Sequence, residues 1–201
     1  TLLTNSIILF IISAILNGPW RDPQSGWPQS PEIAENTRLP QLVARSRLHF
    51  GFVLALMAVA IVWFMLTRTS FGLKLRAVGL GKEGARFAGI HVERTMLVAA
   101  LISGGIAGIA GYVEVAGIQY HLIGELSPGY GYTGIIIATM GGLNALGAAG
   151  SALFFGLVET GAQTVSRALG VPIYLGEVTQ ATMLLVILGM FLLQRYRIRR
   201  A

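Results

Sequence analysis

Two carboxylates lie where a charged side chain is costly, and they are the residues best placed to do chemistry. Glu114 and Glu159 each fall inside a long apolar stretch. A carboxylate at bilayer depth costs at least ~2.5 kcal/mol, so each should face a cavity, a partner or the protein interior. One interpretation places them on a polar path, hydrogen-bonded to a solute hydroxyl. The other places them near helix ends or against a neighbouring helix. The two interpretations stand level for Glu114, and the second is favoured for Glu159.

Other reactive chemistry is missing from the sequence. There is no cysteine, which excludes disulfides, cysteine-ligated zinc and a thiol nucleophile. The three histidines are scattered, and His121 has no second His or Cys nearby, so we predict neither a metal site nor a Ser/His/Asp set. The phosphate-binding pattern G-x-x-x-x-G-K-[ST] is absent, because Gly81-Lys82 is followed by Glu83. We therefore expect a chain that is not an enzyme and binds no cofactor or metal of its own.

A small polar group follows one of the apolar stretches. We interpret it as a solvated turn, and the alternative is contact with a partner protein or gating of an outer opening. Its members are Gln119, Tyr120, His121 and Glu125.

The composition indicates an integral membrane protein. Hydrophobic residues make up 54% of the 201 residues and charged residues only 12%, whereas an average soluble domain carries about 25% charge. Several apolar runs approach the ~20 residues that cross a bilayer. The net charge of +6 does not indicate nucleic acid binding, because the basic residues cluster at the ends of apolar runs, as they do on cytoplasmic membrane flanks.

The apolar runs divide the chain into about six spans or part-spans within one transmembrane domain, residues 1–201. The chain begins with Thr, and we interpret residues 2–16 as the end of a helix in a fragment that lacks N-terminal sequence. Residues 17–48, which are rich in proline and contain two tryptophans, should form an irregular extracytoplasmic loop. The segment at 132–141 is short, so it either extends into its neighbours or is a half-helix shielded by protein. The remaining spans are expected at 49–66, 95–117, 148–167 and 177–194.

The one long basic stretch, residues 67–94, separates two spans. Thr69-Ser70 can cap a short helix, and Glu83 and Arg86 are spaced to pair on one helical face. A solvated basic loop is the simpler interpretation of this spacing. If this stretch and the C-terminus are both cytoplasmic, that side holds ten Lys and Arg against five on the other, which favours this topology.

One predicted span contains a stripe of glycines. Gly104 and Gly108 form a G-x-x-x-G pair, and Gly111 extends the stripe. Such a face lets another helix approach closely, so these glycines are predicted to serve helix packing.

Several stretches carry a resemblance to a known family. TSFGLKLRAVG followed by GARFAGI resembles the cytoplasmic loop of permease subunits of ATP-binding-cassette (ABC) importers, in the branch serving ribose, branched-chain amino acids and nucleosides. ISGGIAGIAGYVEV, SPGYGYTGIIIATMGG and NALGAAGSALFFGLVETGA are similar to later parts of those subunits. The order and spacing look closest to bacterial nucleoside permeases. The resemblance extends from about residue 50 onward and is weak over 17–48.

The resemblance implies a mechanism and a set of partners. In that family a coupling helix in the basic loop docks on ATPase subunits, which bind ATP and Mg²⁺ and hydrolyse ATP in trans. It further implies a second permease subunit, the same or related, an extracytoplasmic solute-binding protein and a bacterial plasma membrane. Glu114 and Glu159 become candidates for the translocation path. The residues assigned to ATPase coupling are Leu73, Arg76, Gly79, Glu83, Arg86 and Gly89.

We therefore expect an all-α membrane bundle that forms the path of an ATP-driven importer, with nucleosides as cargo. Simple sugars and branched-chain amino acids are the alternative cargoes. An ion-coupled secondary transporter is a different class, but it should contain an inverted repeat, and none is evident. An intramembrane enzyme would need paired catalytic residues within spans, for which Glu114 and Glu159 are thin support.

Overall fold

The computed structural model describes residues 2–43, 46, 48–124, 126 and 129–170, with scattered positions between 174 and 189. This described part is helical and contains no strand beyond two isolated bridges, Gln29 with Ile123 and Gln41 with His49. The chain falls into two compact units, Thr1–Pro128 and Gly129–Ala201. The span expected at 177–194 and the basic C-terminus lie largely or wholly outside the described residues.

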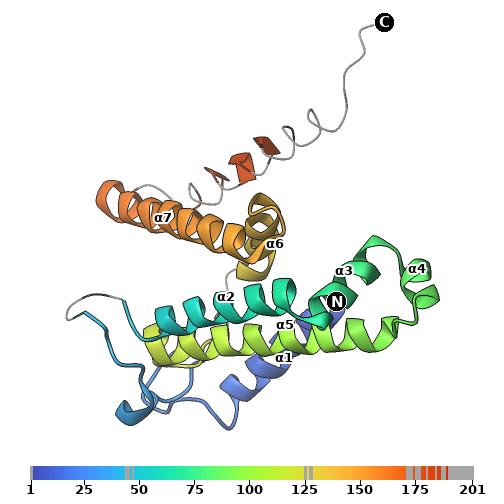
Figure 1. The fold of residues 1–201 in the computed structure, drawn as a ribbon. Coiled ribbons are helices and arrows are strands. Elements are labelled where there is room, and N and C mark those ends of the chain that lie inside the picture. Colours follow the sequence, from blue (N-terminus) through green and yellow to red (C-terminus); the bar gives the residue numbers. More distant parts are fainter. Residues whose placement is uncertain are drawn as a thin grey trace, which may run out of the picture. The chain divides into compact units, whose positions relative to one another are not determined.

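The first unit contains two long helices that lie side by side (Figure 1). Two shorter helices connect the two long ones. An irregular segment with a single 3₁₀ turn, η1 (Glu35–Thr37), precedes the first long helix. The helices are α1 (Leu2–Asn17), α2 (Gly51–Arg68), α3 (Ser70–Leu80), α4 (Lys82–Phe87) and α5 (Val92–Glu114), which continues into a π-helical turn, η2 (Val115–Gln119).

Three helices among the described residues are long and apolar enough to cross a membrane. They are Gly51–Arg68, Val92–Gln119 and Ala145–Leu169. At 1.5 Å per residue even the 18-residue α2 extends about 27 Å, close to the ~30 Å of a hydrocarbon core. These spans agree within a few residues with the apolar runs at 49–66, 95–117 and 148–167, and the all-α membrane fold is confirmed.

The irregular segment 18–50 and the basic segment 69–91 lie at opposite ends of the α2–α5 pair. The first precedes α2 and is bonded to the end of α5, through Leu39 N–H to the Ala116 carbonyl at 2.9 Å. The second contains α3 and α4, which connect the end of α2 to the start of α5 (Figure 1). Helices of spanning length therefore separate a segment of mixed composition from a strongly basic one.

The second unit is a hairpin of a short and a long helix. α6 (Tyr130–Met140) has 11 residues, about 16 Å, which is half the thickness of a bilayer core. This length agrees with the half-helix alternative for 132–141, and the shielding of that half-helix by protein stays a prediction. α7 (Ala145–Leu169) is capped by Asn144, whose Oδ1 accepts from Leu146 N–H at 3.1 Å. Gly141 approaches the first turn of α7 so closely that a Cβ there would overlap the backbone of Ala148.

Candidate functional site

The candidate site is the basic hairpin formed by α3 and α4, and a tight joint attaches it to α2. Thr69 alone separates the two helices, and its Oγ1 accepts from Gly72 N–H at 3.3 Å, so it caps α3 as predicted. Gly72 backs onto the last turn of α2, and a Cβ at this position would overlap the Leu66 carbonyl. The sequence folds sharply here because glycine has no side chain to prevent the approach.

A small apolar core holds the hairpin together. Val78 of α3, Ala85 of α4 and Val92 of α5 are buried against one another, with Ala77 and Ile90 packed beside them. The basic stretch is therefore two helices that pack on the start of α5, rather than one helix in a solvated loop.

α4 ends in a glycine-dependent cap. Gly89 has φ = 77°, in the left-handed region where glycine is favoured. Its N–H bonds the Arg86 carbonyl, and Ile90 N–H bonds the Ala85 carbonyl, both at 2.9 Å. This pair of bonds is a Schellman motif, which turns the chain from α4 into α5. Gly89 therefore has a structural role in addition to its predicted place in a coupling surface.

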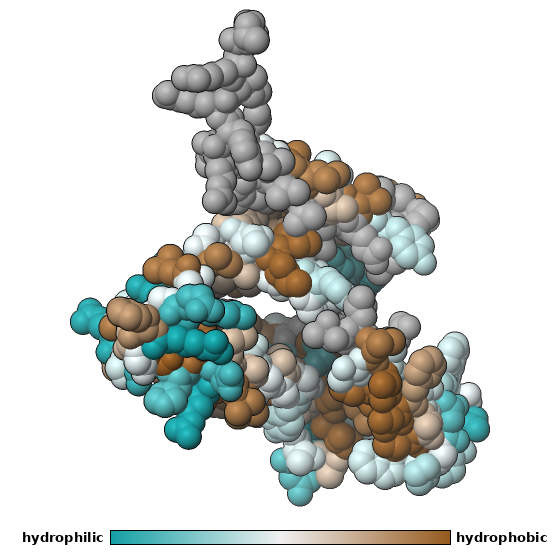
Figure 2. Space-filling view, turned by 90° about the vertical axis from the view of Figure 1, so that its right-hand side faces the viewer, coloured by the Kyte–Doolittle hydropathy of each residue, from teal (hydrophilic) through white to brown (hydrophobic). Residues whose placement is uncertain are grey.

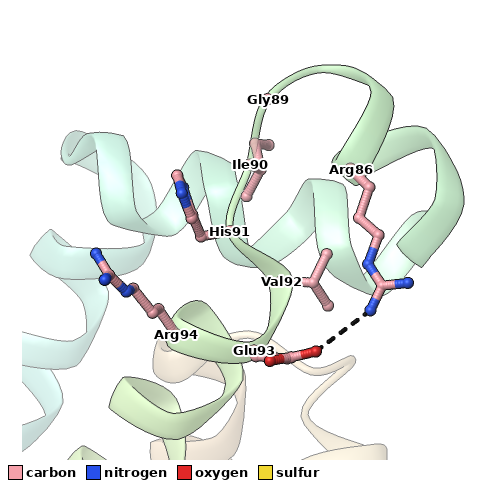
Figure 3. Close-up of a pocket in the computed structure, with 7 residues that line it drawn as sticks. All are labelled: Arg86, Gly89, Ile90, His91, Val92, Glu93 and Arg94. Carbon is pink, nitrogen blue, oxygen red and sulfur yellow. Dashed lines mark hydrogen bonds and ion pairs between the residues drawn. The ribbon is translucent and has the colours of Figure 1, made fainter.

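One ion pair links α4 to α5. Arg86 Nη2 lies 3.5 Å from Glu93 Oε1, and both side chains are largely exposed. The sequence spacing had suggested Glu83 as the partner of Arg86, but the turn at Gly89 brings Glu93 within reach instead. Figure 3 shows Arg86 pointing toward Glu93, whereas His91 and Arg94 point away from this pair. These residues line a shallow pocket of about 450 Å³.

The residues predicted to contact an ATPase all lie on the surface of the hairpin. None takes part in its core, so all are available to a partner. In Figure 2, which looks from the α3–α4 side, hydrophilic residues gather together with apolar residues among them. The exposed predicted residues are Leu73, Arg76, Gly79, Glu83, Arg86 and Gly89.

Two apolar residues of this surface were not among the predicted residues. Leu80 is 92% exposed and Phe87 is 98% exposed, although both belong to a segment outside the apolar spans. A single exposed apolar side chain is common on a protein surface, but two large ones on a basic segment outside the membrane spans make this hairpin a candidate contact surface. The sequence signal was available: each is a bulky apolar residue directly beside small or charged residues in a basic stretch.

Three hairpin glycines have no structural reason to be glycine. A Cβ added at Gly79, Gly81 or Gly84 would meet nothing within 4 Å, and none of the three has a positive φ that favours glycine. Because glycine has no side chain, the surface of another protein can approach the backbone closely at these three positions. Such a contact would account for the glycines, whereas the fold of this chain does not.

The two candidate path carboxylates fall in different units, and each has a partner on its own helix or the turn that follows it. Glu114 is the last residue of α5 and half-buried, with Oε1 3.5 Å from Gln119 Nε2. Glu114 therefore lies near the C-terminal end of the apolar helix Val92–Gln119, one residue before the π-helical turn. Glu159 lies inside α7 and accepts a hydrogen bond from Gln163 Nε2 at 3.2 Å.

The glycine stripe of α5 lies open within its own unit. A Cβ at Gly104, Gly108 or Gly111 would meet no atom of residues 2–124 within 4 Å. The role of these glycines in helix packing stays a prediction.

The polar group after α5 is ordered rather than a free solvated turn. Ile33 N–H bonds the Tyr120 carbonyl at 2.9 Å, and His121 Nδ1 lies 3.1 Å from the Ser30 carbonyl. Gln119 is the last residue of the π-helical turn. Glu125 lies outside the described residues.

Comparison with known proteins gives a consistent set of relatives. Residues 1–193 match the family described as branched-chain amino acid transport system, permease component. The guanosine ABC transporter permease of Bacillus subtilis is 33% identical over 202 residues, covering 99% of this chain and 57% of that protein. The glucose ABC transporter permease of Haloferax volcanii is 30% identical over 211 residues, covering 98% and 56%.

A third relative is more distant. The nucleoside ABC transporter permease of Lactococcus lactis is 28% identical over 157 residues, covering 78% of this chain and 43% of that protein. The chain thus spans about half the length of the curated relatives that it matches. No solved structure matches it significantly.

Proposed function

The chain belongs to the family of permease components of branched-chain amino acid transport systems, and we therefore propose that it forms part of the membrane path of an ATP-driven importer. The three apolar helices of spanning length among its described residues make it a multi-pass membrane protein. In the complete transporter, this subunit and a second, related permease subunit together form the membrane path. A solute-binding protein delivers cargo on the outside, in a bacterial plasma membrane.

The observation that carries the proposal is the exposed apolar pair on the basic hairpin. Leu80 and Phe87 lie on a hairpin whose own core, built from Val78, Ala85 and Val92, is already complete. Burying one such side chain against a partner contributes about 1.5–3 kcal/mol. The partner we propose is an ATPase subunit that binds ATP and Mg²⁺. The hairpin then lies in the cytoplasm, in agreement with its basic charge, and so does the C-terminus.

Nucleosides are the proposed cargo, and sugars are the second candidate. Two of the relatives described above are named for guanosine and nucleosides, and one for glucose. The glucose permease covers nearly the same share of the chain at similar identity, so overall identity does not separate these two cargoes. Branched-chain amino acids, after which the family is described, are the third candidate.

Reconstitution with a partner ATPase tests the proposal. The full-length permease pair is placed in proteoliposomes with and without its ATPase, with the cognate solute-binding protein outside, and uptake of labelled uridine, glucose and leucine is measured with ATP inside. We expect uptake only when both the ATPase and hydrolysable ATP are present. Uptake that persists without the ATPase and follows an imposed ion gradient would instead identify a secondary transporter.

A further inference from the structure

We propose that Trp20 and Trp27 anchor the loop of residues 18–30 in the headgroup layer of the membrane, at the surface opposite the basic hairpin. The partner is a phospholipid surface. Trp20 is 58% exposed and Trp27 is 76% exposed, so neither ring serves to pack the loop itself. The inference goes beyond the proposed importer function and needs only the membrane spans described above.

Trp20 directly follows α1, a short helix with an apolar surface. Leu3, Ile7 and Phe10 of α1 are each more than half exposed, as expected of a helix that contacts lipid or other spans. Trp20 N–H bonds the Ile15 carbonyl at 3.1 Å, so its backbone is held at the end of this helix. Tryptophan is enriched where apolar helices meet the headgroups, because its ring is apolar and its N–H is a hydrogen-bond donor.

Trp27 belongs to a closed turn that begins beside Trp20. The two ends of the turn meet where Asp22 N–H bonds the Gln29 carbonyl at 2.9 Å. Within the turn, Trp27 N–H bonds Ser25 Oγ at 3.2 Å, and the Trp27 carbonyl accepts from Gln29 N–H at 2.9 Å. Asp22 lies two residues after Trp20, so one compact element carries both exposed rings. An element that is already ordered loses little conformational freedom when it inserts.

The backbone of this loop satisfies its own donors. From residue 18 to residue 30, every backbone N–H except that of Gly26 donates a hydrogen bond within the chain, and the prolines at 19, 23 and 28 have no N–H to donate. A loop surrounded by water has no need of such completeness, whereas a free N–H next to lipid is costly. This bonding favours the membrane surface as the environment of the two rings.

The charges of the loop favour lipid over the other possible occupant, the solute-binding protein. Residues 18–30 carry only Arg21 and Asp22, whose charges balance, whereas docking surfaces between proteins are commonly complementary in charge. Asp22 Oδ1 accepts from Gln24 N–H at 3.0 Å. The Arg21 side chain has no ion-pair partner among the described residues, and a lipid phosphate beside the two rings would supply one.

The anchor connects the membrane surface to the end of α5. Gln29, at the end of the closed turn, forms an isolated bridge with Ile123. Ser30 N–H bonds the Leu122 carbonyl at 3.0 Å, and Leu122 N–H returns a bond to Ser30 Oγ at 2.8 Å. Rings held at the headgroup level therefore also fix the level of the chain that leaves α5.

Fluorescence quenching by brominated lipids tests the anchor. Three single-tryptophan forms of the full-length permease keep Trp20, Trp27 or Trp63, and every other tryptophan of the permease pair is replaced by phenylalanine. Each form is reconstituted with the ATPase in phosphatidylcholine–phosphatidylglycerol vesicles whose acyl chains carry bromine near the headgroup, near the chain end or nowhere. Trp63 lies within the span α2 and is the control for insertion. The same vesicles are assayed for ATP-driven uptake with the solute-binding protein outside.

We expect Trp20 and Trp27 each to lose more emission with bromine near the headgroup than with bromine near the chain end. The reason is that both rings lie at the level of the headgroups. Trp63 should lose emission with at least one of the two lipids. Addition of the solute-binding protein should leave the emission of Trp20 and Trp27 unchanged.

Two results would overturn the inference. Emission from Trp20 or Trp27 that neither lipid quenches, in vesicles where Trp63 is quenched, would place that ring in water or under another part of the protein. Emission that shifts with the solute-binding protein, without quenching by lipid, would assign the surface to that protein. Either result together with ATP-driven uptake would leave the importer function intact. Lipid quenching of both rings in a complex that takes up no uridine, glucose or leucine would support the anchor and contradict the importer function.

Discussion

Replacing Phe87 by alanine should weaken the complex with the ATPase without affecting the fold. The Phe87 side chain is 98% exposed, so its removal leaves no cavity and costs the isolated chain less than about 0.5 kcal/mol. If the ATPase buries the ring, its loss should cost about 1.5–3 kcal/mol of binding free energy. That cost corresponds to an increase of about 10- to 100-fold in the dissociation constant.

The assay is a titration of the detergent-solubilised permease pair with the purified ATPase subunit, together with thermal unfolding of each permease variant. Trp27→Ala is the matched control. Trp27 is also a strongly exposed aromatic residue, 76% exposed, but it lies in the segment at the opposite end of the α2–α5 pair. This control should bind the ATPase with unchanged affinity, because its side chain would lie on the far side of the membrane.

The reasoning would be refuted by a Phe87→Ala variant that binds the ATPase as tightly as the unaltered permease. It would be refuted equally if Trp27→Ala weakened ATPase binding by the same factor, since the ATPase would then not be selecting the hairpin end. A lowered unfolding temperature for Phe87→Ala would show that the ring is buried within the permease itself.

Two further predictions concern glycines at close backbone contacts. Gly72→Ala should lower the unfolding temperature of the permease, because its Cβ would overlap the Leu66 carbonyl at the α2–α3 joint and cost about 1–3 kcal/mol. The control Gly79→Ala has open space around its Cβ and should not lower the unfolding temperature. An unfolding temperature for Gly72→Ala equal to that of the unaltered permease would contradict the tight joint. Gly141→Ala should likewise destabilise the α6–α7 hairpin, while Gly150→Ala within α7 should leave stability unchanged or raise it by up to ~1 kcal/mol. Thermal unfolding of the two variants side by side checks the second pair, and equal unfolding temperatures would contradict the close approach of α6 and α7.

Much of the fold could be predicted from the sequence because a bilayer imposes simple rules. Apolar runs near 20 residues must become helices that satisfy their own backbone groups, so α2, α5 and α7 followed from run length. The caps at Thr69 and Asn144 were also predictable, since a short polar side chain before a helix can bond its first free N–H groups. Both features depend on residues that are neighbours in the sequence.

The features that sequence reasoning missed depend on contacts between distant residues or on exposure. Arg86 pairs with Glu93 only because the left-handed Gly89 reverses the chain between them. The bonds that hold Tyr120 and His121 to the segment 18–50 join residues about 90 positions apart, and no local pattern predicts them. The exposure of Phe87 could be known only after the hairpin core had been located.

The joint at Thr69 has a mechanical consequence. A single residue between α2 and α3, with Gly72 pressed against the last turn of α2, leaves no slack in which the hairpin could swivel alone. Because the hairpin also packs on the start of α5, we expect a torque applied to it to reach α2 and α5 together, as tilt. Over 18 residues, about 27 Å, such a lever arm turns a small rotation at one membrane surface into a displacement of several ångströms at the other, beside His49.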